Sequence, residues 1–454
     1  MDRRTFLKAA SSFALLLPLT GRKAFAQNQQ AYSGPFLLCI HAGGGWDTTM
    51  AFDPKIPYED ATGIKVINKT YEKADACGTF GNFSYAPIEY YLSPADPKTL
   101  LLHSPRNFLE NHGSNMLLIN GVDTQTNAHP VGEQVVWSGH VGRDYPSLGA
   151  LLAIKASRES DKIPCAYFAN NGGYVRTLGL VPLTQVNSSD RIRELSNQET
   201  LPVAGATTKL FSEKTSQRIQ QANEKRIQML RQQLSLPEST TALGNYDKAM
   251  LAKNSLGTLV DAAAGGLPTT PVTLASLKPG AGNGIDTELQ QAEMALYGFK
   301  TGSMVSASLT LGGFDSHSNN DNVQRLRMGY LLIFVEYVLN KAKALGLDKQ
   351  LTVVVGSEFS RTPAYNVDNG KDHWNTTSYM LFGPGIPGGR VLGHTTRNQY
   401  PDHVDPKNPS QLLPKESGGM VLRPSHVHHA LRRTLGLADF NVPYEFLEKD
   451  ISLF

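Results

Sequence analysis

The stretch that decides the fold is LTVVVGSEFSRT, residues 351–362. Its first five residues carry no charge and are mostly β-branched, which is typical of a strand buried on both faces of a parallel sheet. The carboxylate of Glu358, the hydroxyl of Ser360 and the guanidinium of Arg361 follow directly. In open α/β sheets, ligands bind at the carboxyl ends of the strands. The stretch therefore predicts a parallel sheet with a polar site at its edge.

Strands and helices alternate along most of the chain. Apolar runs that predict further strands lie at residues 35–41, 115–121, 163–168, 304–311 and 379–382. Segments with helical patterns lie at 129–137, 148–155, 289–299, 322–345 and 425–435. This alternation predicts an α/β fold, with a mainly parallel central sheet and helices on both faces.

Residues 205–265 differ from the rest of the chain. Long polar helix formers dominate residues 210–234, and a second helical segment follows at 245–264. Together the two segments predict a helical hairpin that lies on the surface or acts as a lid. We expect one α/β domain over residues 27–454, with this hairpin as an insertion.

The first 26 residues have the pattern of an export signal. Arg3 and Arg4 form a twin-arginine motif, and residues 24–26, Ala-Phe-Ala, form a cleavage site. The apolar run between them is shorter than the roughly 20 residues that a membrane-spanning helix needs. We therefore expect recognition by the twin-arginine export machinery, a periplasmic or otherwise exported location, and no membrane span after cleavage. An uncleaved anchor or a short cytoplasmic helix is the alternative.

Charge and cysteine content narrow the classes of partner and metal site. The chain has 43 basic and 40 acidic residues, but residues 1–26 contain five of the basic and one of the acidic ones. The remaining 38 basic and 39 acidic residues give no reason to expect binding to nucleic acid or anionic lipid. The three cysteines, Cys39, Cys77 and Cys165, form no CxxC pair, so a thiolate zinc site is not expected. Two of them could form one disulfide, and the sequence leaves open which two.

Polar groups follow several of the predicted strands, and all would lie at the same edge of a parallel sheet. Asp315 and His317 are two residues apart, so at a strand end their side chains point the same way. Carboxylates and imidazoles without cysteine suit Zn²⁺, Mn²⁺ or Mg²⁺. We therefore expect one or two divalent ions, held by Asp47, Asp315, His317, Glu358 and His373. The alternative is a set of polar turns in which Glu358 pairs with Arg361.

Other polar residues near these positions could act on a substrate. Arg361 could hold an anionic group through bidentate hydrogen bonds. His129 is a candidate nucleophile or acid–base group at the start of a predicted helix. Thr126, Ser360 and Asp372 are secondary candidates.

These motifs resemble those of the DUF1501 family, within the alkaline phosphatase/sulfatase superfamily. The resemblance is carried by the twin-arginine start and by four segments, residues 44–47, 129–139, 315–319 and 357–362 with 372–373. It implies an alkaline phosphatase-like fold and a metal-dependent hydrolase that acts on a phosphate or sulfate ester. The implied ligand is a small anionic ester or a saccharide-type molecule.

Two departures from the superfamily pattern favour an alternative function. Phe359 stands where the superfamily has a metal-binding histidine, and no serine or threonine clearly occupies the nucleophile position. The alternative is therefore a catalytically silent member that binds a ligand or a partner.

Overall fold

The computed structural model describes residues 32–71, 77–142, 145–159, 165–169, 210–233, 271–302, 304–440 and 449–454, with a few isolated positions between 174 and 244. All of these residues belong to one unit, residues 32–454. Helix α6 (Glu213–Gln233) corresponds to the first helix of the expected hairpin. The expected export signal and the helix expected at 245–264 lie outside the described residues.

An eight-stranded sheet forms the centre of the fold, in the order β10-β9-β11-β1-β12-β15-β8-β16. Its strands are β1 (Phe36–Ala42), β8 (Leu117–Asp123), β9 (Cys165–Ala169), β10 (Thr184–Gln185), β11 (Met304–Leu311), β12 (Leu351–Gly356), β15 (Thr376–Phe382) and β16 (Arg390–Leu392). Among these described strands, β15 alone runs against its neighbours, β12 and β8, and the other pairs are parallel. The predicted mainly parallel sheet is confirmed.

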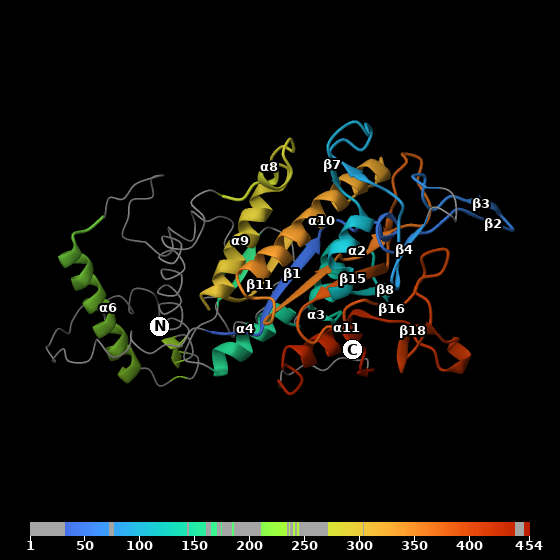
Figure 1. The fold of residues 1–454 in the computed structure, drawn as a ribbon. Helices are drawn as coiled ribbons and strands as arrows, with labels where there is room; N and C mark the ends of the chain where they lie inside the picture. Colours follow the sequence, from blue (N-terminus) through green and yellow to red (C-terminus); the bar gives the residue numbers. More distant parts are fainter. Residues whose placement is uncertain are drawn as a thin grey trace. The chain divides into compact units, whose positions relative to one another are not determined.

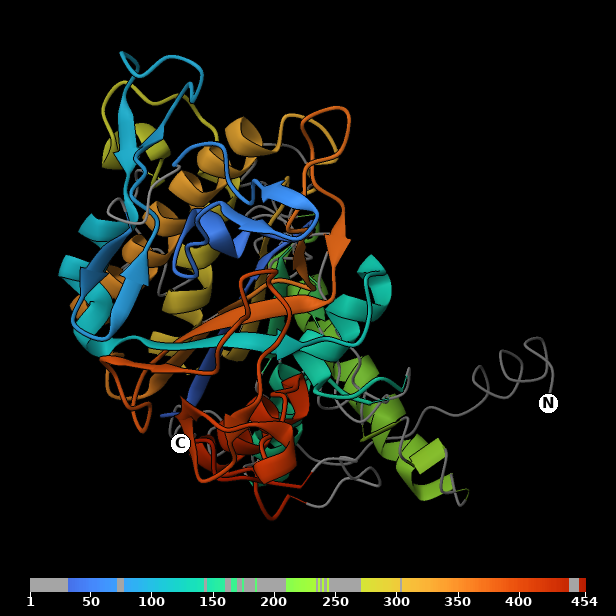
Figure 2. The same cartoon turned by 90° about the vertical axis from the view of Figure 1, so that its right-hand side faces the viewer.

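Helices cover both faces of the sheet, as predicted. Helices α2 (Pro105–His112), α9 (Asp286–Lys300) and α10 (Asn320–Ala344) pack on one face. Helices α3 (His129–Ser138), α4 (Leu148–Glu159) and α11 (Pro424–Thr434) pack on the other. The two views of the fold show α9 and α10 across the sheet from α11 (Figure 1, Figure 2). No helix in the described part of the chain is long and apolar enough to cross a membrane.

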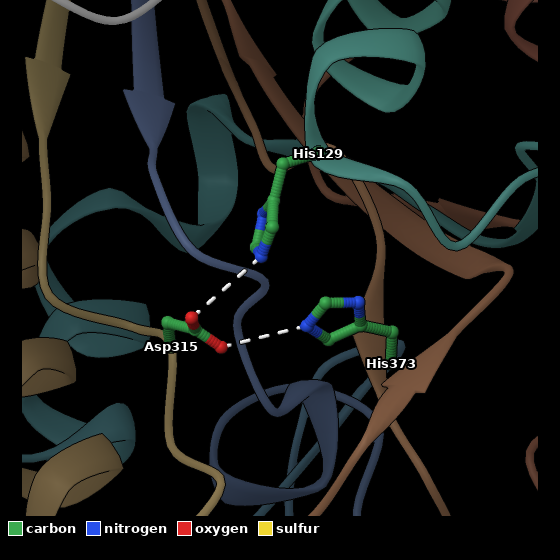
Figure 3. Close-up of side chains that lie close together, drawn as sticks. All are labelled: His129, Asp315 and His373. Carbon is green, nitrogen blue, oxygen red and sulfur yellow. Dashed lines mark ion pairs between the residues drawn. The ribbon is translucent and has the colours of Figure 1, made fainter.

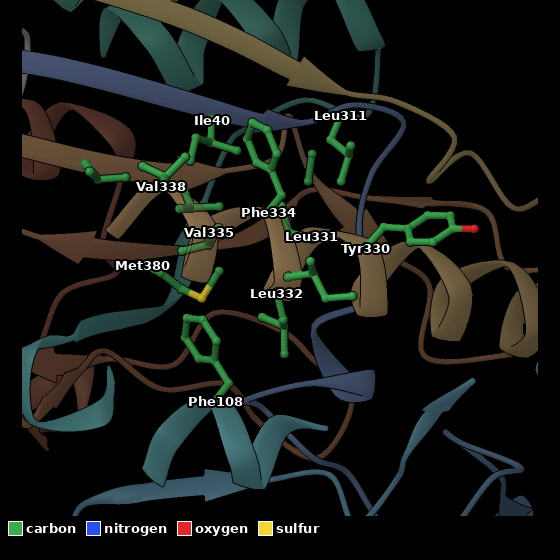
Figure 4. Close-up of a cluster of buried hydrophobic side chains, with 14 of the residues drawn as sticks. Ile40, Phe108, Leu311, Tyr330, Leu331, Leu332, Phe334, Val335, Val338 and Met380 are labelled. Carbon is green, nitrogen blue, oxygen red and sulfur yellow. The ribbon is translucent and has the colours of Figure 1, made fainter. Parts of the chain in front are cut away.

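The alternation of side chains along β1 separates two hydrophobic cores. Leu38 and Ile40 point into the core beneath α10, whereas Leu37 and Cys39 point into the core beneath α3 and α4. Figure 4 shows the first core, where side chains of α10 meet Ile40 of β1 and Met380 of β15. β1, whose residues are apolar except for His41, is therefore buried on both sides.

Shorter elements surround the sheet, and sequence patterns did not predict them because each is too short to show a period. They are β2 (Tyr58–Asp60), β3 (Gly63–Lys65), β4 (Gly78–Phe80), β5 (Phe83–Tyr85), β6 (Tyr90–Tyr91), β7 (Leu101–His103), β13 (Ser360–Arg361), β14 (His373–Trp374), β17 (Val404–Asp405) and β18 (Asn408–Leu412). The remaining helices are α8 (Leu274–Leu277) and the 3₁₀ turns η1 (Thr48–Met50), η3 (Gly113–Asn115) and η4 (Lys415–Ser417).

The strand directions bring several loops to one edge of the sheet. Strands β1, β11 and β12 are parallel and all end there. Strand β8 ends there too, because β15 is antiparallel to both β12 and β8, which makes β8 parallel to β12. For the same reason β15 begins there, and β14 directly precedes it. The loop after β1 presses on the loop after β11, since the amide of Phe314 donates to the carbonyl of Gly43 at 3.1 Å.

Gly44 is required for this close approach. Its φ is +115°, a value that favours glycine, and an added Cβ would lie 2.3 Å from the backbone nitrogen of Asp315. Gly63 has a similar φ of +109°, but nothing lies within 4 Å of an added Cβ. The two glycines therefore differ in crowding rather than in backbone conformation.

Gly44→Ala is expected to lower the free energy of unfolding by about 1–3 kcal/mol more than Gly63→Ala. Both variants carry the strain of a left-handed backbone, but only the first forces two loops apart. Urea denaturation of the two variants and the wild-type protein measures the difference. Equal losses in the two variants would contradict the account of the crowded turn.

Candidate metal centre

Four side chains meet at the edge where the strands end, and we call them the His/Asp cluster: His129, Asp315, His317 and His373. Asp315 Oδ1 lies 3.2 Å from His317 Nε2 and 3.5 Å from His373 Nε2. Asp315 Oδ2 lies 3.7 Å from His129 Nε2. The Nε2 atoms of His317 and His373 are 2.9 Å apart. Figure 3 shows His129 and His373 directed at the carboxylate of Asp315 from separate elements.

Each imidazole of the cluster has its outer nitrogen, Nδ1, near an oxygen that accepts hydrogen bonds. The contacts are His129 with Glu358 Oε1 at 2.8 Å, His317 with Asp372 Oδ1 at 2.8 Å, and His373 with the carbonyl of Asn127 at 2.7 Å. Ionised carboxylates and carbonyls do not donate, so each Nδ1 carries the proton. Nε2 of each ring then faces the centre of the cluster. The hydrogen bond with Glu358 raises the pKa of His129, although burial opposes this.

The contact between His317 and His373 favours a positive charge between the two rings. Two lone pairs at 2.9 Å repel each other unless a positive charge lies between them. A proton on either ring is one such charge. Burial and the nearby charge of Arg361 lower the pKa of His373, although its bond to the carbonyl of Asn127 opposes this. A divalent ion is the other, and ligands at about 2.1 Å from a tetrahedral ion lie about 3.4 Å apart. The contacts of Asp315 with the three rings, at 3.2, 3.5 and 3.7 Å, bracket that value, whereas the 2.9 Å between His317 and His373 is shorter.

The composition and exposure of the cluster fit a metal that works on a substrate. Three imidazoles and one carboxylate suit Zn²⁺ or Mn²⁺. The side chains of Asp315 and His317 are 48% and 50% exposed, so water and solutes reach them. Four protein ligands fill a tetrahedral zinc ion, so a water would have to enter here as a fifth ligand, as happens when a catalytic ion expands its coordination.

Glu358 lies behind His129, and its carboxylate is buried. Oε1 accepts from the amide of Gly44 at 2.7 Å as well as from His129, and Oε2 accepts from the hydroxyl of Ser357 at 3.0 Å. Burial raises the pKa of Glu358, but the hydrogen bond from His129 and the nearby His41 outweigh burial and lower this pKa to about 2. The carboxylate is therefore ionised and orients the ring of His129.

Arg361 lies in the interior, with its guanidinium fully buried. Nε donates to the carbonyl of Gly45 at 2.8 Å, and Nη1 donates to the carbonyl of Lys371 at 3.1 Å. Nη2 donates to the carbonyl of Gly44 and to Asp315 Oδ1, the latter at 2.8 Å. Burial raises the pKa of Asp315, but this bond outweighs it and leaves the pKa lowered. Arg361 thus holds a carboxylate of the cluster, and its donors point to protein oxygens.

Asp47 forms a buried ion pair with Lys371, at 2.7 Å between Oδ2 and Nζ. Both side chains are fully buried. Asn320 donates to Oδ2 at 3.0 Å, and the hydroxyl of Thr49 donates to Oδ1 at 2.6 Å. The carboxylate of Asp47 is thereby satisfied by protein groups.

The structure brings together four of the residues predicted from sequence and places the others around them. Asp315, His317 and His373 converge with His129, while Glu358, Asp372 and Arg361 contact members of the cluster from outside. The hydroxyl of Thr126 accepts from the amide of Ala128 at 3.2 Å in the turn before α3, and Ser360 is buried 3.5 Å from Thr48 Oγ1. The roles assigned to these residues from sequence stay predictions.

Sequence reasoning missed two groups that shape the cluster, Lys371 and the carbonyl of Asn127. Lys371 sits between Gly370 and Asp372 in the predicted motif, yet no pattern distinguishes a buried lysine from an exposed one. It also missed the pairing of His41 and Glu133 with Glu358, a second group whose ligand atoms lie within 4.8 Å of one another.

Lys371→Met is expected to lower the free energy of unfolding by about 3–5 kcal/mol, because Asp47 would remain as an unpaired buried charge. Adding Asp47→Asn should restore part of this loss. Arg106→Met, which breaks the exposed pair with Glu110, should change stability little and serves as the control. Chemical denaturation measures all three, and a Lys371→Met variant as stable as the control would contradict the buried pair.

Comparison with solved structures gives distant matches. The lipoteichoic acid synthase LtaP of Listeria monocytogenes is 9% identical, with a TM-score of 0.37, over 90% of this chain and 73% of its own. A protein of glycosaminoglycan metabolism in Bacteroides thetaiotaomicron is 9% identical, with a TM-score of 0.35, over 90% of this chain and 74% of its own. A magnesium-bound mutant of the TAB5 alkaline phosphatase is 10% identical, with a TM-score of 0.31, over 78% of this chain and 93% of its own.

Comparison at the level of sequence identifies the family. No curated protein matches the chain. Residues 36–416 match the family described as protein of unknown function, DUF1501, and this match spans most of the chain. The chain therefore belongs to the DUF1501 family.

Proposed function

We propose that this protein is an exported, metal-dependent hydrolase that acts on a phosphate or sulfate ester. The observation that supports it is the convergence of the Nε2 atoms of three histidines on the half-exposed carboxylate of Asp315. A divalent ion held there would act as a Lewis acid and lower the pKa of a bound water. His129, Asp315 and His373 offer ligand atoms that lie within 4.8 Å of one another, a spacing that suits one ion.

The surrounding residues would keep the ligands in place. Glu358, Asp372 and the carbonyl of Asn127 fix the rings of the three histidines, and Arg361 fixes Asp315. Phe359 packs against the cluster, with its ring centroid 4.8 Å from that of His129 and 4.5 Å from that of His373. This apolar wall limits rotation of both rings on one side.

The attacking group would be water rather than a side chain. Of the hydroxyls predicted to lie nearby, that of Thr126 is engaged in a turn and that of Ser360 is buried. The Asp315 carboxylate and the histidine nitrogens occupy the exposed part of the site instead. Hydrolysis without a covalent intermediate is consistent with this arrangement.

The class of substrate and the location rest on the sequence. The motifs shared with the superfamily favour a small anionic ester or a saccharide-type ligand. The twin-arginine pattern of residues 1–26 favours action in the periplasm or outside the cell, after passage through the twin-arginine machinery.

A second candidate is a catalytically silent protein that binds a ligand or partner. Two charged residues expected to act on the substrate or the metal, Arg361 and Asp47, are instead engaged by protein groups inside the fold. This observation favours binding over turnover, and the experiments below separate the two functions.

Protein expressed with its signal intact is expected to contain about one divalent ion per chain by elemental analysis. Asp315→Ala and His373→Ala each remove a ligand and should reduce the bound metal to a small fraction of an ion. His394→Ala alters an exposed histidine outside the cluster and should leave the metal content unchanged. Wild-type protein that contains no metal, even after incubation with Zn²⁺ or Mn²⁺, would overturn the proposed metal centre.

The metal-loaded protein is expected to hydrolyse at least one compound in a panel of phosphate and sulfate esters. Asp315→Ala should reduce turnover by roughly 100-fold or more, the scale seen when one charge-stabilising group is removed from an active site. His394→Ala again serves as the control. Stoichiometric metal without turnover of any ester would contradict the hydrolase and favour the silent binding protein.

A further inference from the structure

A second group of polar side chains lies behind the His/Asp cluster, where β1 ends. His41 is 2% exposed, and its Nε2 lies 3.2 Å from Glu358 Oε2 and 3.7 Å from Glu133 Oε1. These three residues have the composition and spacing of a metal site. Nε2 of His41 has no well-aligned hydrogen bond, so its role depends on whether it carries a proton.

Trp137 decides the protonation of His41. Its indole Nε1 lies 3.1 Å from His41 Nδ1, and an indole nitrogen can only donate. His41 Nδ1 must therefore be unprotonated, which places the proton of the neutral ring on Nε2. A metal ligand would have to present a lone pair there. This group consequently directs an N–H at two carboxylates, an arrangement that does not suit a second ion.

We propose that His41 and Trp137 are positioning residues of the metal centre, although neither contacts it. This inference rests on the proposed function, and it assigns to a buried chain of donors the task of orienting His129. Trp137 donates to His41, Nε2 of His41 lies 3.2 Å from Oε2 of Glu358, and Oε1 of Glu358 accepts a hydrogen bond from Nδ1 of His129.

Each link in this chain determines the next. Oε2 of Glu358 faces His41 and also accepts from the hydroxyl of Ser357 at 3.0 Å, so the carboxylate is held from that side. Oε1 is then directed at the amide of Gly44 and at His129. Because Nδ1 of His129 donates to Oε1, Nε2 is the nitrogen that faces Asp315. The chain therefore sets both the tautomer and the direction of one ligand.

The test measures the Kd for Zn²⁺ of full-length variants by competition with a chelator. His41→Phe removes the imidazole nitrogen that lies 3.2 Å from Glu358 and is expected to weaken binding by about 10–100-fold, the range for outer groups that orient metal ligands. His41→Gln keeps an N–H donor and should recover part of the affinity. If His41 acted only through packing, His41→Gln would not bind Zn²⁺ more tightly than His41→Phe.

Trp137→Phe provides a second route that spares the histidine. It should also weaken Zn²⁺ binding, because the indole no longer fixes the tautomer of His41. Trp46→Phe is the matched control, since Trp46 is equally buried and its indole donates to Thr377 Oγ1 at 3.2 Å, outside the chain of donors. Wild-type affinity in both His41→Phe and Trp137→Phe would overturn the proposal.

Nitrogen-15 NMR of labelled histidines in the metal-free protein tests the chain directly. We expect the proton of His41 on Nε2 and that of His129 on Nδ1. A proton on Nδ1 of His41 would overturn the proposal whatever the affinities. Wild-type protein that binds no Zn²⁺ would contradict the proposed function instead. The observed tautomers of His41 and His129 would then show whether the chain of contacts exists.

Discussion

The guanidinium of Arg361 joins three loops that are far apart in the sequence. It donates to carbonyls in the loop after β1, to the carbonyl of Lys371 in the loop before β14, and to the carboxylate of Asp315 after β11. A fully buried charge is stable only when most of its donors find acceptors. The position of this one charge therefore constrains the loops that carry the His/Asp cluster.

A second buried cation supports the same loops. Lys371, two residues before His373, pairs with Asp47, which is the N-cap of η1 after β1. The two carboxylates bound by these cations differ in one respect. Asp47 is fully enclosed, whereas Asp315 is half exposed and shares its oxygens between Arg361 and the cluster. That difference explains why only Asp315 is placed to meet an ion and a solute.

Much of the fold could be predicted from the sequence because its central strands are buried on both faces. Continuous apolar runs placed β1 and β11 within one residue of their observed bounds, and β12 likewise. The reversed direction of β15 could not be predicted, since strand direction depends on tertiary pairing. That direction nevertheless brings His373 to the edge where Asp315 lies. The antiparallel pair of β13 and β14 places His373 opposite Arg361.

The sequence predicted which residues would form the candidate site better than it predicted how they are arranged. The two-residue spacing of Asp315 and His317 indicated side chains with a common direction, and they do meet at Asp315. The positions of Glu358 and His129 relative to the centre depend on which nitrogen carries a proton, and local sequence holds no signal for that. The same holds for Arg361, whose burial follows from the close approach of the glycine loop after β1.

The central claim is that one ion is held by three imidazoles and the carboxylate of Asp315. Anomalous diffraction from crystals of the Zn²⁺-loaded protein tests it most directly. The account predicts a single strong peak about 2.0–2.2 Å from Nε2 of His129, His317 and His373 and from one oxygen of Asp315. A peak between His41, Glu133 and Glu358 instead, or no peak at Asp315, would contradict it.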